Sequence, residues 1–303
     1  MFDVITFGSA TNDVFLKIKK EDFKLGRKVL VDDKIESSGG GGTNTACTLS
    51  SLGFKTSYCG LVGRDKEGRA IIKDLRKFKV SRVFLQKRDK TAFSLVLSSG
   101  RERTIFVFKG SCHFMKKEDI PFQNLKTKWF YIAPLYDKTL LLFKPIISFA
   151  KKNKIKLCVN LSKEQLEKGK EKLKPLLKEI DILLLNEGEA KELLGSKNII
   201  KGLASLCPKI VVVTQGHKGS FVISKGSLFN VKPHNVPFLE KTGAGDAYGS
   251  GFLAGLLKKN SIEYAIQVAS NNAELCIKKV GAKEGLLTNF KNLKTVQISK
   301  KKL

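Results

Sequence analysis

The stretch Glu240-Lys241-Thr242-Gly243-Ala244-Gly245-Asp246-Ala247-Tyr248 decides how the rest of the chain is interpreted. From Asp246 onward, apolar residues recur at the spacing of one helix face, which predicts a helix. Gly243, Ala244 and Gly245 then lie at its N-terminus, where backbone N–H groups have no partner inside the helix and an anion can approach them. Asp246 places a proton acceptor beside these amides, as transfer of a phosphoryl group to a hydroxyl requires.

The same stretch has a plainer interpretation. Gly-Ala-Gly is also a tight turn, and an aspartate that follows it is also a helix cap, because short motifs of this kind occur by chance. The remainder of the chain has to decide between a site and a turn.

Length and composition favour one large domain over residues 1–303. The hydrophobic fraction of 42% is enough for a substantial core. No apolar run approaches the roughly 18 residues of a membrane span. The first eight residues read as a strand and lack the basic start of a signal peptide. We therefore expect a cytoplasmic protein without a membrane partner.

Neither cysteines nor histidines suggest a structural transition metal. No Cys-x-x-Cys occurs, and the three histidines lack zinc-ligand spacing. We expect the six cysteines to be buried free thiols. They are Cys47, Cys59, Cys112, Cys158, Cys207 and Cys276.

The chain is strongly basic, with 56 lysines and arginines against 28 acidic residues and a formal net charge of +28. Such a charge attracts polyanions, so a basic nucleic-acid-binding protein built on the same fold is one alternative function. The lysines are spread over nearly every segment, however, and no nucleic-acid-binding motif is recognisable. A lysine-rich surface is the favoured interpretation, and we do not expect a nucleic-acid partner.

Alternating patterns indicate a small separate sheet. Half-exposed strands are expected at 14–19 and 29–35, and residues 92–108 read as a hairpin around a turn at 98–103. We pair this hairpin with the early strands. The resulting β-sheet lid projects from the main body and comprises about residues 13–36 and 91–109.

The main body reads as a three-layer α/β/α fold with a mostly parallel central sheet. Strands and helices alternate along it. The expected strands are 3–8, 57–62, 129–133, 156–160, 181–185 and 210–214, and the expected helices are 43–52, 66–78, 139–152, 163–179, 187–195 and 199–206. Ligands of such sheets bind beyond the carboxyl ends of the strands.

Polar and glycine-rich turns follow several of these expected strands. Asn160, Asn186 and Thr214 each end a strand, and Gly39–Asn44 precedes a helix. Each turn has an explanation in turn chemistry alone, but together they gather where a nucleotide would lie. No P-loop and no dinucleotide fingerprint is present.

Four ordered motifs make the chain resemble the ribokinase-like (PfkB) family of carbohydrate and nucleoside kinases over nearly its whole length. The motifs are Thr242-Gly243-Ala244-Gly245-Asp246, Gly39-Gly40-Gly41-Gly42-Thr43-Asn44 with Gly63-Arg64-Asp65-x-x-Gly68, Asn186-x-x-Glu189, and Thr214-x-Gly216-x-x-Gly219. The resemblance implies the α/β/α core with a β lid over the acceptor, and it implies ATP and Mg²⁺ as cofactors.

The resemblance also implies a role for each matched residue. Asp246 is the implied base that takes the proton of the acceptor hydroxyl, and the amides of the residues before it form the anion hole. Asn186 and Glu189 are the implied ligands of Mg²⁺ and phosphates, with Glu189 reaching the metal through water. Thr214, Gly216 and Gly219 are implied to border ATP. Asp13, Gly40 and Asn44 are implied to hold the acceptor hydroxyls.

The chain departs from the family pattern at several positions. Glu240 and Lys241 stand where many members carry Asp and then Ser or Thr, which leaves activation by K⁺ open. Asn160-Leu161-Ser162 is more similar to the adenosine-kinase branch, and Ala133-Pro134 offers no carboxylate to a ribose hydroxyl. The expected acceptor is a sugar, with a nucleoside as the alternative and a sugar phosphate left open. A homodimer through edge strands of the lid is a further expectation.

Overall fold

The structure is a computed structural model that describes residues 1–19, 26, 28–99, 102–195, 199–206 and 208–303. Its main sheet contains, in spatial order, β14 (Gln297–Lys302), β13 (Ser227–Lys232), β12 (Ser220–Ser224), β11 (Ile210–Thr214), β10 (Ile182–Asn186), β9 (Lys156–Asn160), β8 (Thr127–Ile132), β1 (Phe2–Phe7), β4 (Thr56–Val62) and β5 (Ser81–Lys87). From β11 to β5 neighbouring strands are parallel, whereas β12, β13 and β14 continue the sheet antiparallel. The mostly parallel sheet predicted from the sequence is confirmed.

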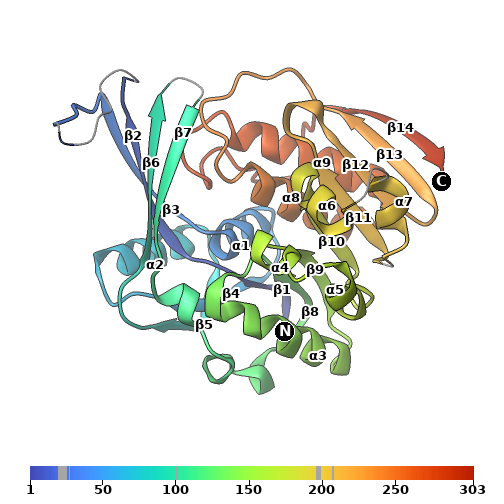
Figure 1. Cartoon of the computed structure of the whole chain (residues 1–303), viewed down its shortest axis with the longest axis horizontal. Coiled ribbons are helices and arrows are strands. Elements are labelled where there is room, and N and C mark those ends of the chain that lie inside the picture. The colour runs from blue at the N-terminus through green and yellow to red at the C-terminus, as the bar shows by residue number, and fades with distance from the viewer. Residues whose placement is uncertain (20–25, 27, 100–101, 196–198, 207) are drawn as a thin grey trace.

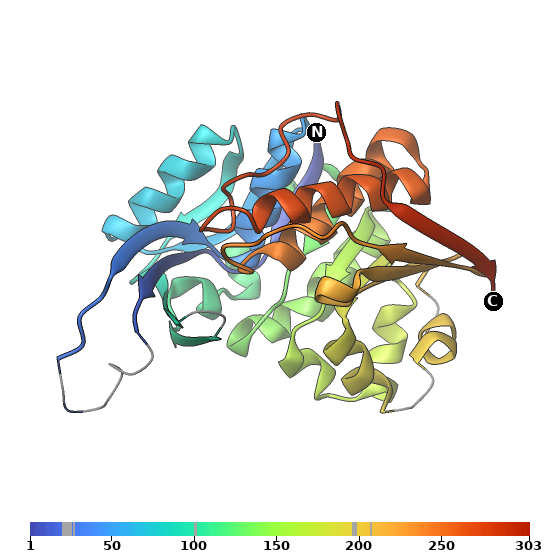
Figure 2. The same ribbon diagram turned by 90° about the horizontal axis from the view of Figure 1, so that it is seen from above.

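Helices cover both faces of this sheet, so the predicted three layers are present (Figures 1 and 2). One face is covered by α1 (Gly41–Ser51), α2 (Lys66–Lys77), α8 (Ala244–Lys259) and α9 (Ile262–Cys276). The other face is covered by α3 (Phe143–Lys152), α4 (Lys163–Leu166), α5 (Lys170–Leu177), α6 (Glu187–Leu194) and α7 (Ile199–Ala204). No helix of the described residues is long and apolar enough to cross a membrane.

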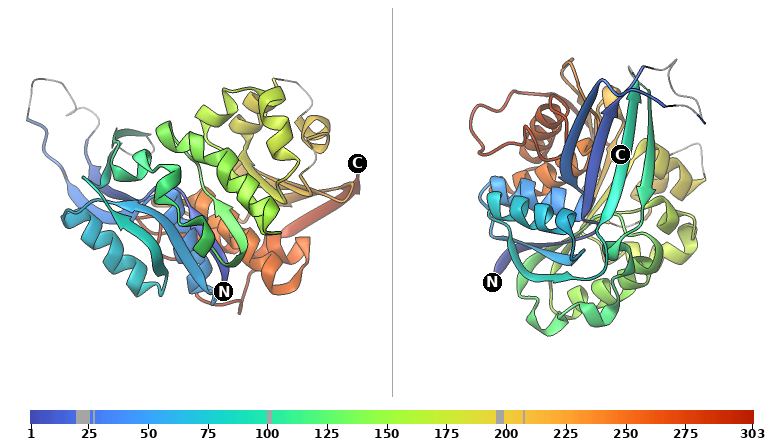
Figure 3. Two further views of the ribbon diagram at one scale, coloured as in Figure 1. Left: turned by 90° about the horizontal axis from the view of Figure 1, so that it is seen from below. Right: turned by 90° about the vertical axis from the view of Figure 1, so that its left-hand side faces the viewer.

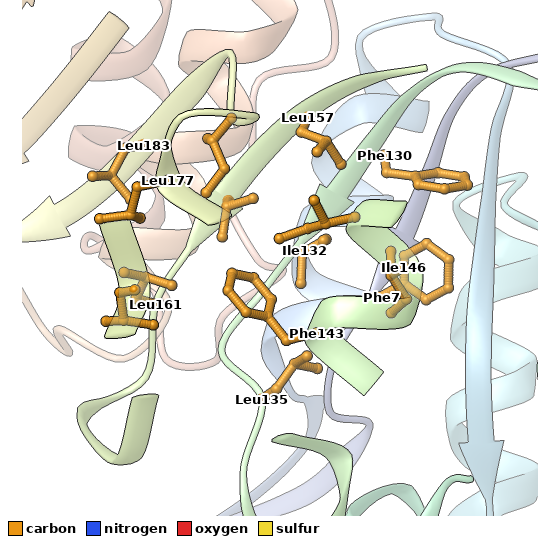
Figure 4. Close-up of a cluster of buried hydrophobic side chains, with 14 of the residues drawn as sticks. Phe7, Phe130, Ile132, Leu135, Phe143, Ile146, Leu157, Leu161, Leu177 and Leu183 are labelled. Atoms are coloured by element: carbon orange, nitrogen blue, oxygen red, sulfur yellow. The ribbon is translucent and has the colours of Figure 1, made fainter. Parts of the chain in front are cut away.

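Apolar side chains fill the space between the sheet and each helix layer. On the face of α3 to α7, Phe130 and Ile132 of the sheet meet Ile146 and Leu177 of the helices (Figure 4). On the other face, Phe252 of α8 belongs to an equivalent cluster with strand residues. Each such side chain contributes about 1.5–3 kcal/mol when fully buried. The two packed faces hold the strand ends, and therefore the site, in fixed positions.

A second sheet stands away from the body on one side (Figure 3, right). It consists, in spatial order, of β3 (Asp33–Gly39), β2 (Thr11–Lys17), β6 (Ala92–Ser99) and β7 (Glu102–Phe108). The predicted pairing of the 92–108 hairpin with the early strands is confirmed. The predicted lid segment 13–36 and the turn 98–103 include residues 20–25, 27 and 100–101, which lie outside the described residues.

Several predicted boundaries are wrong. The strand expected at 29–35 is β3, shifted toward Ser37, Ser38 and Gly39, because these small residues pair with β2. A side chain at Gly39 would strike Asp13, so a sequence that looks like a loop forms a strand. The helix expected at 163–179 is broken into α4 and α5 at Gly169, whose φ of 82° ends one helix and begins the next.

Other elements were not predicted at all. The antiparallel strands β12 to β14, the edge strand β5 and the helix α9 are the main additions. The five cysteines that the structure describes are buried and free, as predicted. Cys207 lies outside the described residues. The lysine runs at 151–154 and 300–302 are exposed, consistent with a lysine-rich surface.

Candidate active site

The carboxyl ends of three neighbouring strands bring together polar residues that are distant in sequence. Asn160 of β9 pairs in register with Leu184 of β10, and Asn186 of β10 pairs with Thr214 of β11. The Oδ1 atom of Asn160 is buried and has no hydrogen-bond partner among the described residues. Because a buried polar atom without a partner is costly, this edge is suited to a polar ligand.

Helix α8 begins at this side of the sheet without a side-chain cap. Its N-cap is Gly243, which has a φ of 81°. The amide of Ala244 donates to the carbonyl of Lys241 (3.2 Å), whereas the amides of Gly243 and Gly245 have no acceptor among the described residues. Gly245 is exposed, and the space where its side chain would lie is open. Two of the three predicted anion-hole amides are therefore available to a ligand, and that of Ala244 is partly engaged.

Asp246 lies in the first turn of α8, and its carboxylate accepts a hydrogen bond from the Nδ2 of Asn44 (2.8 Å). Asn44 belongs to α1 and is 4% exposed, and its Oδ1 has no partner among the described residues. A Cβ placed on Gly41 would come within 3.4 Å of the Asp246 carboxylate. The N-termini of α1 and α8 thus meet at one carboxylate.

The pKa of Asp246 is raised above its usual value because burial disfavours the charged form, and the nearby charge of Asp13 raises it further. The hydrogen bond from Asn44 and the charge of Lys283 act in the opposite direction. A carboxyl group whose pKa is raised by burial, next to an anion-binding helix end, is the kind of group that serves as a general base.

Asp13 reaches the same region from the lid strand β2. The hydroxyl of Thr11 donates to its carboxylate (2.9 Å), and Ser94 of the neighbouring strand also bonds to it. Burial raises the pKa of Asp13. Gly39 of β3 makes room for this carboxylate. Gly40 follows as the N-cap of α1, with a φ of 96° and no space for a side chain.

The predicted pair Asn186 and Glu189 forms a capping box at the start of α6. The Asn186 side chain accepts from the amide of Glu189 (2.9 Å), and the Glu189 carboxylate accepts from the amide of Asn186 (2.8 Å). Burial raises the pKa of Glu189. Both residues therefore have a structural task at this helix end. Across the described ranges, no cluster of three or more His, Cys, Asp or Glu side chains that could hold a metal ion is present.

The predicted nucleotide motif that starts at Thr214 forms the tight connection from β11 to β12. Gly216 has a φ of 59°, and the space beside it is open. A Cβ on Gly219 would stand 2.1 Å from the carbonyl oxygen of Val231 in β13. Gly219 is therefore required for strand packing, while Thr214 and Gly216 lie at the ligand edge of the sheet.

One contact between lid and body was not predicted. The guanidinium of Arg103 in β7 pairs with the carboxylate of Glu240 (2.6 Å) and donates to the hydroxyl of Thr242 (3.0 Å). The same oxygen of Glu240 accepts from the amides of Lys241 and Thr242 and from the Thr242 hydroxyl. Because Glu240 directly precedes the anion-hole stretch, this ion pair joins the lid to it.

Two further residues at the site carried no signal in the sequence. Tyr136 lies close to three carboxylates, and burial together with the charges of Asp246, Glu189 and Glu164 raises its pKa to about 12. Lys283 is buried beside Asp13 and Asp246. Lys283 is one of 56 basic residues, so composition and spacing could not single it out.

A small pocket adjoins the carboxylates. Its lining includes the ring of His113, which stacks on Tyr136 with 5.9 Å between ring centroids, together with Met115 and Leu135. Pro134, another lining residue, lies 3.6 Å from the Cβ position of Gly41 and so borders the space around Asp246. The walls of this pocket are mostly aromatic and apolar.

Comparison with known proteins agrees with this architecture. Residues 1–289 match the pfkB family of carbohydrate kinases. The chain is 30% identical over 258 residues to an uncharacterized sugar kinase of Archaeoglobus fulgidus, which covers 78% of this chain and 97% of that protein. It is 27% identical over 282 residues to a ribokinase of Haemophilus influenzae, a match that covers 86% of this chain and 87% of that protein. It is 24% identical over 293 residues to a cytidine kinase of Thermococcus kodakarensis, a match that covers 93% of this chain and 98% of that protein.

Solved structures share the fold. A ribokinase of Arabidopsis thaliana complexed with ribose and ATP has a TM-score of 0.80 at 21% identity, covering 96% of both chains. A putative ribokinase II of E. coli in complex with ATP and Mg²⁺ has a TM-score of 0.82 at 20% identity, covering 95% of this chain and 96% of that one.

The chain belongs to the pfkB family of carbohydrate kinases. The fold is ribokinase-like, with a large mostly parallel sheet and a small separate sheet. Its enzyme class is that of a carbohydrate or nucleoside kinase, which transfers a phosphoryl group to an alcohol group.

Proposed function

We propose that the chain, acting as one catalytic unit over residues 1–303, moves the γ-phosphoryl group of ATP to a hydroxyl of a sugar. The observation that carries this proposal is the position of Asp246, a half-buried carboxylate in the first turn of α8 beside the free amides of Gly243 and Gly245. A base and an anion-binding helix end in contact are the two parts that this transfer needs.

In the proposed reaction Asp246 accepts the proton of the acceptor hydroxyl. The hydroxyl oxygen forms a bond to phosphorus as the bond from phosphorus to the departing ADP oxygen breaks, so the phosphoryl group changes partner and the proton stays on the carboxylate. The amides of Gly243 and Gly245 donate to the transferred group. Asp13 and Asn44 orient the acceptor, since both are buried and Asn44 has an oxygen without a partner among the described residues.

ATP and Mg²⁺ fit the residues at the strand ends. Asn160 and Asn44 have buried oxygen atoms without partners, and the α8 N-terminus is open at Gly245. Asn186, Glu189, Thr214 and Gly216 are the residues that we expect to hold nucleotide and metal, Glu189 through water, while Gly219 shapes the turn. When bound, Mg²⁺ neutralises phosphate charge, and it prefers oxygen ligands with only one or two from the protein.

The second candidate is a nucleoside acceptor. The observation behind it is the similarity to a cytidine kinase, with 24% identity over 93% of this chain. The basic surface adds no candidate, because its exposed lysines are dispersed. We keep the sugar as the first proposal and the nucleoside as its alternative.

We expect ATP consumption with Mg²⁺ on a panel of pentoses, hexoses, hexose phosphates and nucleosides to identify one acceptor class. Turnover should not require K⁺, because the Arg103 guanidinium already pairs with Glu240. Product identification by mass spectrometry separates acceptor phosphorylation from simple ATP hydrolysis. Silence on every acceptor, despite ATP binding measured by calorimetry, would contradict the proposal. A strict K⁺ requirement would contradict only the expectation about Glu240.

We also propose that two copies associate through the lid. Strand β7 is an edge strand, and four consecutive apolar residues on it (Ile105, Phe106, Val107 and Phe108) are each 44–57% exposed. An exposed apolar edge with unpaired backbone groups is a template for another strand. A second copy is the occupant we propose, because it brings an identical edge to the contact.

Sedimentation at micromolar concentration should give a mass of twice 33.6 kDa. Val107→Lys should shift the mass toward one chain, since it places a charge at the centre of the apolar edge. Leu141→Lys is the matched control, because Leu141 is 75% exposed and is not part of the lid sheet. A monomeric wild-type protein would rule out this association.

A further inference from the structure

Lys283 differs from the other lysines and arginines whose side chains the structure describes, which are at least partly exposed. It is 3% exposed, and it is the only buried cation among the lysines and arginines whose side chains the structure describes. Burying an ammonium group is costly unless anions and hydrogen bonds compensate. Its surroundings therefore need an explanation.

Lys283 lies in the segment that follows α9 and passes between the lid and α8 (Figure 1). Gly281 lies against Ser37 of β3, since a Cβ there would be 2.8 Å from the Ser37 hydroxyl. Ala282 lies against Gly243, the N-cap of α8. The ammonium of Lys283 then donates to the hydroxyl of Ser38 (2.6 Å). The segment thus contacts both the acceptor side and the anion-binding side of the site.

Titratable groups from four elements interact electrostatically with this ammonium. They are Asp13 of β2, Asp74 of α2, Asp246 of α8 and the thiol of Cys47 in α1. Burial lowers the pKa of Lys283, and these four groups raise it. The Ser38 hydroxyl in turn donates a hydrogen bond to the carboxylate of Asp74, with 2.7 Å between Ser38 Oγ and Asp74 Oδ2. Among the described residues the ammonium donates only to this hydroxyl, which links it to Asp74, and it acts on Asp13 and Asp246 through its charge.

The buried carboxylate of Asp13 and the half-buried one of Asp246 carry like charges that interact. The charge of Asp13 raises the pKa of Asp246, in addition to the effect of burial. Lys283 lowers the pKa of both carboxyl groups. Asn44 lowers the pKa of Asp246 by its hydrogen bond, and Thr11 and Ser94 do the same for Asp13. Like charges in a low-dielectric site otherwise protonate one member of the pair.

We propose that Lys283 is a positioning residue for phosphoryl transfer, a built-in counter-charge that keeps Asp13 and Asp246 ionised together. Asp13 then accepts hydrogen bonds from the acceptor while Asp246 remains able to take its proton. The inference rests on the proposed roles of these two carboxylates. It assigns Lys283 no contact with the substrate.

The pH dependence of kcat/KM tests the proposal, because its acid limb reports the free enzyme's essential base. For Lys283→Gln we expect kcat/KM at about pH 6 to fall on the order of tenfold below wild type, with recovery at about pH 8.5, since the loss of a counter-charge raises the pKa of a carboxyl group. Lys283→Arg should keep the wild-type acid limb even where kcat falls. Lys279→Gln, the same change at an exposed lysine just before this segment, is the matched control.

An unchanged acid limb in Lys283→Gln, or an equal loss at every pH, would overturn the inference. Lys283→Met removes the same charge without adding a buried amide, and it serves where the Gln variant does not fold. Carboxyl ¹³C NMR of aspartate-labelled protein gives a readout without turnover, with Asp246→Asn assigning the signal. In Lys283→Gln the titrations of Asp246 and Asp13 should move to higher pH. If wild type turns over no acceptor, the proposed function fails, while this titration still decides the role of Lys283.

Discussion

Replacing Asp246 with Asn should lower kcat by about 10²–10⁴-fold, the usual contribution of a positioned general base. The amide keeps the size of the carboxylate and can still accept from Asn44, but it cannot take a proton. Binding of ATP should change little, because the amides of Gly243 and Gly245 are unaltered. Steady-state kinetics on the identified acceptor and calorimetry with ATP measure the two quantities.

Stability separates this loss from misfolding. Because burial raises the pKa of Asp246, the ionised carboxylate opposes folding at neutral pH, and this cost is relieved only as the pH falls through its raised pKa. Asp246→Asn should therefore unfold at the same temperature as wild type or higher. Asp32→Asn at an exposed position controls for the chemical change. A kcat within about tenfold of wild type would exclude Asp246 as the base.

The two glycines of the anion-binding stretch should respond to alanine in opposite ways. At Gly243 a Cβ would stand 2.4 Å from the Cβ of Ala282, and the φ of 81° disfavours any side chain. The strain and the overpacking together should cost about 2–5 kcal/mol of unfolding free energy. At Gly245 nothing lies within 4 Å of the added Cβ. Since Gly245 lies inside α8, alanine there should stabilise the helix by about 0.5–1 kcal/mol.

Activity should nevertheless fall in Gly245→Ala, because the methyl group shields the open helix end where the phosphoryl group would bind. We expect a loss in kcat on the order of 100-fold, the cost of losing one such donor. Urea unfolding and kinetics on both variants measure the contrast. Wild-type activity in a folded Gly245→Ala protein would show that no anion binds there. Unchanged stability of Gly243→Ala would refute the packing described at Ala282.

The outline of the fold could be predicted because its information is local. Apolar strands from Ile182 to Asn186 and from Ile210 to Thr214, separated by amphipathic helices, specify a parallel sheet covered on both faces. This pattern of apolar and polar side chains can be recognised within a short stretch of sequence. The antiparallel strands β12 to β14 could not be recognised in the same way, because their pairing depends on partners elsewhere in the chain.

The candidate site was predictable in part for the same reason. Glycine at 243 and 245 before Asp246 is a local motif, and so is the capping box of Asn186 and Glu189. The packing task of Gly219 against Val231, by contrast, appears only when the neighbouring strand β13 is in place.

By itself, then, the sequence determined the parallel part of the sheet, the helix that carries Asp246 and the family to which the chain belongs. Only the tertiary structure decided that Lys283 is the buried cation among the described lysines and arginines and that Arg103 of the lid pairs with Glu240. The physical reason is that desolvation and charge pairing depend on spatial distances between segments that are far apart in the sequence. Asn44 and Asp246, for example, are 202 residues apart along the chain. Those distances arise when the lid, α1, α8 and the segment after α9 meet.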